Sequence, residues 1–324
     1  MRVDKWISVI ATFAVFILIC GYGGVKYPNF ASTLVLGNLL TDNAFVIIAG
    51  VGMTLVILTG GIDLSVGSMI ALVGVLTATL ITKYHWNPLY AMAFALVLSS
   101  AFGALMGYLI DAFDLQPFIV TLSGMFFLRG LAFVLSLQSV PISTPLVDDI
   151  ASFAIPLPGR GWLTSSAIIM LAVLVLGIVI AHFTRFGNNV YAIGGDRTSA
   201  ELLGVPIRKT LVGVYAFSGF TSGMAGVVYT LYTSSGYPLA ALGVELDVIA
   251  SVVIGGTLLT GGVGFVIGTL FGGLIQGVIQ TLITFDGSLN SWWTKIVIGF
   301  LLFIFIVLQR ILTSSFGRAS PSPA

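Results

Sequence analysis

The sequence predicts an all-α membrane protein, a polytopic bundle of about ten transmembrane helices. Hydrophobic residues make up 57% of the chain and charged residues 8%, whereas soluble domains are near 25% charged. Long apolar runs alternate with short polar links, and two of these runs are broken by glycine pairs. A chain this poor in charge cannot cover a water-facing surface, so we expect one transmembrane domain over residues 1–324.

Apolar runs of suitable length set the expected spans, since about 20 apolar residues cross the hydrocarbon core. Single spans are expected at 6–22, 89–110, 118–137, 165–183, 210–232 and 292–312. The regions 44–81 and 244–284 are long enough for two spans each. The first run lacks a small-residue cleavage site, which favours a retained helix over a signal peptide.

Lysine and arginine placement predicts the orientation, because short cytoplasmic loops are enriched in these residues. We therefore expect residues 184–209 to be a cytoplasmic loop, and both termini to be cytoplasmic. The residues behind this expectation are Arg185, Arg197, Arg208 and Lys209 in the loop, with Arg2, Lys5, Arg310 and Arg318 near the termini. The loop 138–161 is then external.

Residues 48–68 align without gaps on residues 249–269, and both segments contain Leu-Thr-Gly-Gly. The shared core places helix-break glycines at Gly60, Gly61, Gly261 and Gly262. Paired glycine-broken helices point to the substrate region of duplicated transporters. The predicted topology favours a parallel repeat, and chance similarity between glycine-rich segments is the alternative.

The second broken region carries glycines at helical G-x-x-x-G spacing, which lets helix backbones approach closely. They are Gly264, Gly268 and Gly272, then Gly273 and Gly277. Gln276 and Gln280 follow on one face, and we expect them to avoid lipid. They are either hydrogen-bonding partners for another helix or residues of an aqueous path.

Four further residues are candidates for the translocation path, and three of them have a structural alternative. Arg129 could bind substrate hydroxyls, or reach the interface and cap carbonyl groups. Asp63 could face the path, or serve as an N-cap after the glycine break. Phe118 and Thr121 lie near the start of the fifth expected helix, where packing is the alternative for the phenylalanine. Residues 167–181 and 296–308 lack polar side chains and predict peripheral helices.

Catalytic and cofactor motifs are absent from the sequence. It contains no Walker A loop, nucleophile elbow or H-E-x-x-H, and Cys20 is its only cysteine. The sequence indicates no cofactor, no metal and no enzyme, and the net charge of +1 argues against nucleic acid as a partner. Transport must then use ATP hydrolysis on another chain or an ion gradient. An ion-coupled secondary transporter is the alternative, although such proteins usually bury carboxylates within helices.

Residues 198–204, TSAELLG, resemble the E-A-A-x-x-x-G loop of ABC importer permeases, with Ala200 and Gly204 matching. Segments 52–68, 185–195, 203–205 and 251–257 resemble the ribose-type sugar permeases, and the string G-G-I-D-L-S-V-G is highly specific. Within that family, segments 40–45, 124–130 and 285–295 resemble the permeases of the galactofuranose importer.

This resemblance implies a type II-like ABC permease of the bacterial inner membrane that imports galactofuranose or a related pentose or hexose. It also implies several partners: a second, homologous permease, an ABC ATPase and a periplasmic sugar-binding protein that holds most of the sugar specificity. A short coupling helix should dock on the ATPase, with Gly204 left-handed at its end. Its residues are Thr198, Ser199, Ala200, Glu201, Leu203 and Gly204. Alternatively, its apolar residues tuck against the membrane helices.

Overall fold

The computed structural model describes residues 7–290 and 292–317, with side chains described over 8–290 and 292–307. The predictions that rest on Arg2, Lys5, Trp6 and Arg318, and on the side chain of Arg310, fall outside these ranges. The first half of the chain forms α1 (Ile7–Lys26), α2 (Thr33–Asp42), α3 (Ala44–Leu58), α4 (Val66–Thr82), α5 (Pro88–Ala112) and α6 (Pro117–Leu135).

The segment predicted as an external loop is structured. It contains β1 (Val140–Pro141), α7 (Pro145–Ser152) and β2 (Ala154–Pro156), and β3 (Trp162–Thr164) follows it. The strands β2 and β3 pair antiparallel, while β1 pairs antiparallel with β4 (Ser235–Gly236). The prediction of a loop therefore missed a small helix and two short sheets.

The second half forms α8 (Ser165–Phe183), α9 (Arg185–Gly195), α10 (Arg197–Leu202) and α11 (Ile207–Thr233). It ends with α12 (Val244–Ile254), α13 (Val266–Asp286) and α14 (Trp292–Gly317). Helix starts follow local chemistry: the side chain of Asn87 accepts from Leu89 N at 2.9 Å, and Pro88 occupies the first turn of α5. Proline suits this position because its missing N–H would have no intrahelical partner.

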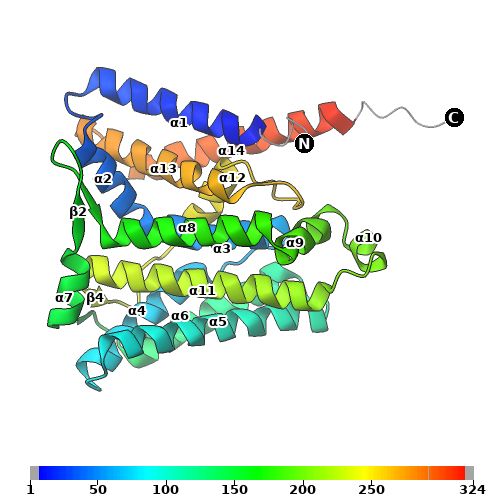
Figure 1. Cartoon of the computed structure of the whole chain (residues 1–324), viewed down its shortest axis with the longest axis horizontal. Coiled ribbons are helices and arrows are strands. Elements are labelled where there is room, and N and C mark those ends of the chain that lie inside the picture. Colours follow the sequence, from blue (N-terminus) through cyan, green and yellow to red (C-terminus); the bar gives the residue numbers. More distant parts are fainter. Residues whose placement is uncertain (1–6, 291, 318–324) are drawn as a thin grey trace.

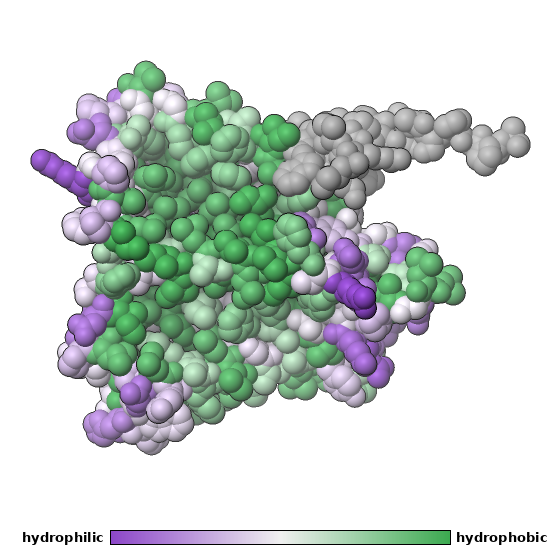
Figure 2. Space-filling view, in the orientation of Figure 1, coloured by the Kyte–Doolittle hydropathy of each residue, from purple (hydrophilic) through white to green (hydrophobic). Residues whose placement is uncertain are grey.

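The long helices lie side by side and share two ends (Figure 1). One end carries α9 and α10, and there α1 begins and α14 ends; the opposite end carries α7 and the short strands. Apolar residues form a broad belt between these ends, and hydrophilic residues gather at both of them (Figure 2). This belt is the surface expected of a bundle that spans lipid.

Six described helices are long and apolar enough to cross a membrane: α1 from Ser8, α5, α6, α8, α11 and α13. A seventh span results if α2 and α3, which meet at a 54° bend, are counted together. Helix α4 and the part of α14 whose side chains are described, Trp292–Val307, are apolar but shorter, and α12 has 11 residues. A multi-pass membrane protein is confirmed, while the number of ten spans stays a prediction.

Helix α13 is central and is packed by its glycines. A Cβ at Gly268 would lie 2.0 Å from the carbonyl oxygen of Gly255, and one at Gly272 would lie 1.9 Å from that of Ser251. Real Cβ atoms do not approach so closely, so the backbones of α12 and α13 can meet at these positions only because the α13 residues are glycines. The expected close approach is confirmed, although Gly264 precedes the helix.

The two helices expected to be peripheral differ in exposure: α14 presents large exposed side chains, whereas α8 is buried on one side. Phe300 and Phe303 on α14 are 66% and 65% exposed. On α8, Val175 is exposed, but Met170 is fully buried and Gly177 packs against Val51 of α3. Helix α8 therefore presents one face to the bundle, because a helix without polar side chains packs against protein as well as against lipid.

Candidate functional site

The two glycine breaks predicted from the sequence meet in space. The N–H of Gly262, in the second break, donates to the carbonyl oxygen of Leu58 in the first at 2.9 Å. Gly60, Gly261 and Gly262 have φ of +81°, +86° and +73°, which glycine adopts at no steric cost. Gly60 thus lets the chain turn after the end of α3, whereas Gly261 and Gly262 lie in the loop between α12 and α13, where they contact the first break.

The broken helices α3 and α12 run in the same direction. Along α13, Gly268 and Gly272 meet Gly255 and Ser251 of the α12 segment in reverse order, so these helices are antiparallel. Along α3 the order is reversed too: Thr269 hydrogen-bonds Thr54 at 2.6 Å, and Gly277 lies against Asn43. This arrangement is the one expected of a parallel repeat, and the duplication itself stays a prediction.

Helix α9 packs directly on both breaks. A Cβ at Gly194 would lie 1.7 Å from the carbonyl oxygen of Leu58 and 2.5 Å from the nitrogen of Gly262. The hydroxyl of Tyr191 donates to the carbonyl oxygen of Gly264 at 2.7 Å. The segment before the coupling helix is therefore joined to the centre of the bundle.

Asp63 is buried in the first break and is held by hydroxyl groups. Its carboxylate accepts from the backbone N–H of Ser65 at 3.0 Å, from the hydroxyl of Ser65 at 2.6 Å, and from Ser218 of α11 at 2.7 Å. The N-cap of α4 is Ser65, not Asp63, so the N-cap assignment was wrong by two residues. Asp63 instead ties the break to α11.

The α6 candidates stabilise neighbouring backbone or face outward. Thr121 is fully buried, and its hydroxyl donates to the carbonyl oxygen of Ile62 in the first break at 3.2 Å. Phe118 is 50% exposed on the surface of α6. Neither placement tests a role in the path, which stays a prediction for both residues.

Arg129 caps carbonyl groups, the structural alternative considered for it. One guanidinium nitrogen donates to Pro238 O at 2.6 Å and to Ala240 O at 2.8 Å. The clamped segment between β4 and α12 includes left-handed backbone at Ala241, with φ of +55°. A non-glycine residue in this conformation is uncommon, and Arg129 holds the chain beside it.

The two glutamines of α13 differ in their surroundings, although both line the smaller of two adjoining cavities, and a role in an aqueous path stays a prediction for both. Gln276 is buried, and its amide nitrogen donates to the carbonyl oxygen of Asp247 on α12 at 3.0 Å. Gln280 is exposed and lines two adjoining cavities of about 430 and 270 Å³. These cavities share Asp42, Asn43, Phe45 and Gln280, and we call them the paired pocket.

Apart from the two glutamines, the paired pocket brings together residues that the sequence did not single out as a site. Asp42 and Asn43 lie at the bend between α2 and α3. The hydroxyl of Tyr232 on α11 donates to Asp42 at 3.1 Å, and the amide of Asn43 donates to Leu39 O at 2.8 Å. A signal was present, because a polar cluster at 38–43 interrupts an apolar region.

The candidates for one path fall into two groups within this chain. The glutamines lie on α13, on one side of α3 and α11, whereas Phe118, Thr121 and Arg129 lie on α6 on the other side (Figure 1). The prediction of one shared path is therefore not supported by the arrangement of a single chain.

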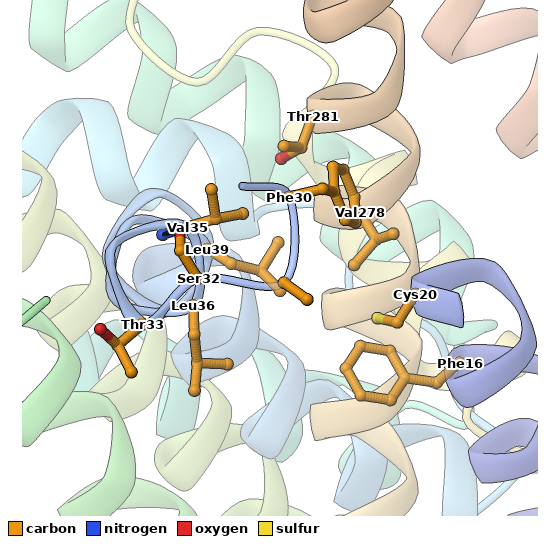
Figure 3. A pocket seen from close by; sticks show the side chains of 11 residues that line it. Phe16, Cys20, Phe30, Ser32, Thr33, Val35, Leu36, Leu39, Val278 and Thr281 are labelled. Atoms are coloured by element: carbon orange, nitrogen blue, oxygen red, sulfur yellow. Dashed lines mark hydrogen bonds between the residues drawn. The ribbon is translucent and has the colours of Figure 1, made fainter. Parts of the chain in front are cut away.

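A third cavity, of about 190 Å³, differs in character. It lies between α1, α2 and α13, and Phe16, Cys20, Leu39 and Val278 surround it with mostly apolar side chains (Figure 3). This mostly apolar lining offers little to a polar ligand.

The coupling segment forms the predicted short helix. Asp196 caps α10 by accepting from Ser199 N at 2.6 Å. Hydrogen bonds from the backbone and the side chain of Ser199 hold the pKa of Asp196 below its usual range. At the other end, Gly204 N donates to Glu201 O at 2.9 Å and Val205 N to Ala200 O at 3.0 Å. This is a Schellman motif, and the left-handed Gly204 is confirmed by its φ of +79°.

The apolar residues of α10 divide between the two alternatives. Ala200 is buried against the bundle, but Leu202 and Leu203 are 84% and 83% exposed. Thr198, Ser199 and Glu201 are exposed as well. Two adjacent leucines in water are unfavourable, so this surface fits a protein partner.

Salt bridges hold the coupling segment in place. Asp111 at the end of α5 accepts from Arg197 at 3.0 Å and from Arg208 at 2.9 Å. Arg197 begins α10 and Arg208 lies in the first turn of α11, so this one carboxylate contacts the chain before and after the coupling segment.

Comparisons with known proteins agree on one family. The model described as "Branched-chain amino acid transport system / permease component" matches residues 35–306. The inner membrane ABC transporter permease protein YjfF of Escherichia coli K12 is 55% identical, over 99% of this chain and 97% of the relative.

More distant relatives carry sugar names. The fructose import permease FruG of Bifidobacterium longum is 38% identical, over 94% of this chain and 91% of its own. The ribose import permease RbsC of Escherichia coli K12 is 36% identical, over 87% and 88%. No solved structure matches.

Proposed function

Because this chain belongs to the family of branched-chain amino acid transport system permease components, and its relatives include ribose and fructose import permeases, we propose that it is the membrane-spanning permease of an ATP-binding cassette importer for a monosaccharide. ATP hydrolysis takes place on a partner chain, and this subunit is not an enzyme.

The observation that carries the proposal is the coupling helix. Leu202 and Leu203 project from a short helix that is capped at both ends and pinned by salt bridges. Rigid presentation of exposed leucines at one end of a membrane bundle suits docking into a groove of a separate ATPase. No observation favours the ion-coupled alternative, since the buried carboxylate of Asp63 is occupied by hydroxyl donors.

The coupling end is proposed to be cytoplasmic, with both chain termini on that side of a bacterial inner membrane. In support, α1 begins and α14 ends at the end that carries α9 and α10 (Figure 1). A periplasmic sugar-binding protein would then dock at the opposite end, and a second, homologous permease would complete the path.

Galactofuranose, or a related pentose or hexose, is the proposed sugar. Two of the three segments that resemble the galactofuranose permeases, 40–45 and 285–295, contribute to the paired pocket. Asp42, Asn43, Phe45, Phe285, Thr294 and Lys295 all line it. This shared location supports the proposed sugar, although the third segment, 124–130, lies in α6.

The test is reconstitution of the assembled transporter in proteoliposomes, with methyl β-D-galactofuranoside, D-ribose, D-fructose and D-allose as candidate cargoes. We expect one of these sugars to stimulate ATP hydrolysis and to accumulate only when ATP is supplied. A Leu202→Ser, Leu203→Ser double variant should insert normally and lose the ATPase in a pull-down. Uptake driven by a sodium or proton gradient without the ATPase would refute the proposal.

A further inference from the structure

The larger cavity of the paired pocket combines polar groups and aromatic rings from four helices. Asp42 and Asn43 come from the α2–α3 bend, Phe45 from α3, Tyr232 from α11 and Gln280 from α13. This cavity, about 430 Å³, falls within the ~300–1,000 Å³ range of small-molecule sites. The site is therefore large enough for a small polar ligand.

We propose that the paired pocket is a binding site for one monosaccharide within this chain, so that the permease itself contributes to sugar selection. This inference rests on the proposed function and deepens it. It differs from the expectation that a separate binding protein holds most of the specificity.

The polar lining matches the chemistry of a sugar. A monosaccharide presents hydroxyl groups that both donate and accept hydrogen bonds. The carboxylate of Asp42 can accept from them, while the amides of Asn43 and Gln280 offer both donors and acceptors. Gln280 and Asp42 are exposed to the cavity, so a ligand can reach them without displacing a helix.

The rings provide an apolar surface for the C–H faces of a sugar. Phe45 is partly buried and packs edge-on against Tyr229, with ring centroids 5.1 Å apart. Tyr232 is 54% exposed, and its hydroxyl is held by Asp42. One ring is thus fixed by packing and the other by a hydrogen bond, so both are positioned before a ligand arrives.

The backbone directs the polar groups of α2 toward α13. The chain bends by 54° between α2 and α3, and the amide of Asn43 would lie 2.1 Å from a Cβ at Gly277. A larger residue at 277 would displace Asn43, so this glycine makes room for the amide beside Gln280 on the next turn of α13.

The apolar cavity on the same helices provides an internal comparison (Figure 3). Val35 and Thr281 line both cavities, yet Phe16, Cys20 and Val278 complete the apolar one. The polar groups are therefore concentrated on one side of α2 and α13, as a polar ligand requires.

The test uses the full permease–ATPase complex in detergent without a binding protein, and measures sugar binding by saturation-transfer difference NMR. The probes are methyl β-D-galactofuranoside, D-ribose, D-fructose and D-allose. Gln280→Leu and Asp42→Asn should each weaken binding of the recognised sugar about 2- to 13-fold, the effect of losing one hydrogen bond. Gln138→Leu makes the same kind of change in the 138–161 segment and should leave binding unchanged.

The outcomes separate this inference from the proposed function. No binding to the wild-type complex, or equal binding in the wild type and both pocket variants, overturns the inference. Loss of the second permease from the Gln280→Leu complex would identify the pocket as a subunit interface and would also overturn it. If wild-type proteoliposomes with all partners still import a sugar in these cases, only the pocket assignment falls. Failure of the wild type to import any sugar with ATP refutes the proposed function.

Discussion

Replacing Gly204 tests the coupling helix, because its geometry separates a backbone effect from a docking effect. Gly204 has φ of +79°, and nothing lies within 4 Å of where its Cβ would be. Any L residue there costs about 1–2 kcal/mol of backbone strain, with no clash inside the chain. Asparagine pays least, because it tolerates the left-handed region.

The strain sets the expected magnitude. A cost of about 1–2 kcal/mol lowers the ratio of capped to uncapped α10 roughly 5- to 30-fold. Gly204→Ala should then reduce uptake partially, and Gly204→Asn should reduce it less. Gly204→Arg carries the same strain and adds a long side chain where the ATPase is proposed to dock, so it should abolish uptake and uncouple ATP hydrolysis from sugar.

The assay measures sugar uptake, ATPase pull-down and membrane abundance for the three variants together. Normal abundance with loss of uptake in the order Asn, Ala, Arg is the expected result. If Gly204→Arg transports and retains the ATPase like the wild type, the docking argument is wrong. Equal defects in Ala and Arg would show that backbone strain alone is responsible.

Three further predictions address the membrane bundle. In a background whose only cysteine is replaced by serine, an impermeant thiol reagent on intact cells should label Ser143→Cys and leave Ser199→Cys unlabelled; the reverse pattern would invert the orientation. Gly272→Val should lower the yield of folded protein, because its Cβ would lie 1.9 Å from a carbonyl oxygen of α12. The control Gly130→Ala places its Cβ where nothing lies within 4 Å and should fold normally. Equal yields of the two variants would contradict this packing. Arg129→Gln removes hydrogen bonds from a charged donor, each worth about 1.5–3 kcal/mol, and should lower the thermal stability of the purified protein; an unchanged melting temperature would show that the clamp contributes nothing.

The transmembrane helices could be predicted from the sequence because their signals are local. Apolar length located the spans, so that the span expected at 118–137 is observed as Pro117–Leu135 and that at 210–232 as Ile207–Thr233. Glycine spacing identified the close approach of α13, and the Leu-Thr-Gly-Gly pairs located both breaks. Each of these features can be recognised within one continuous stretch of the sequence.

The rest depends on contacts between distant residues. Helix α2 has 10 residues, too few for a rule based on membrane thickness, so it was missed. Asp63 finds its partner Ser218 at a separation of 155 residues, which no local pattern reveals. The paired pocket likewise needs Asp42 and Gln280 on helices whose proximity only the fold determines.

The contact between Gly194 and the two breaks has a mechanical consequence. No methyl group fits between α9 and either Leu58 or Gly262. A shift of α9 toward either break would therefore bring backbone atoms into collision. A displacement of α10 would therefore be transmitted through α9 to both breaks at once. Bending at one break would then be coupled to bending at the other, because both breaks contact the same residue, Gly194.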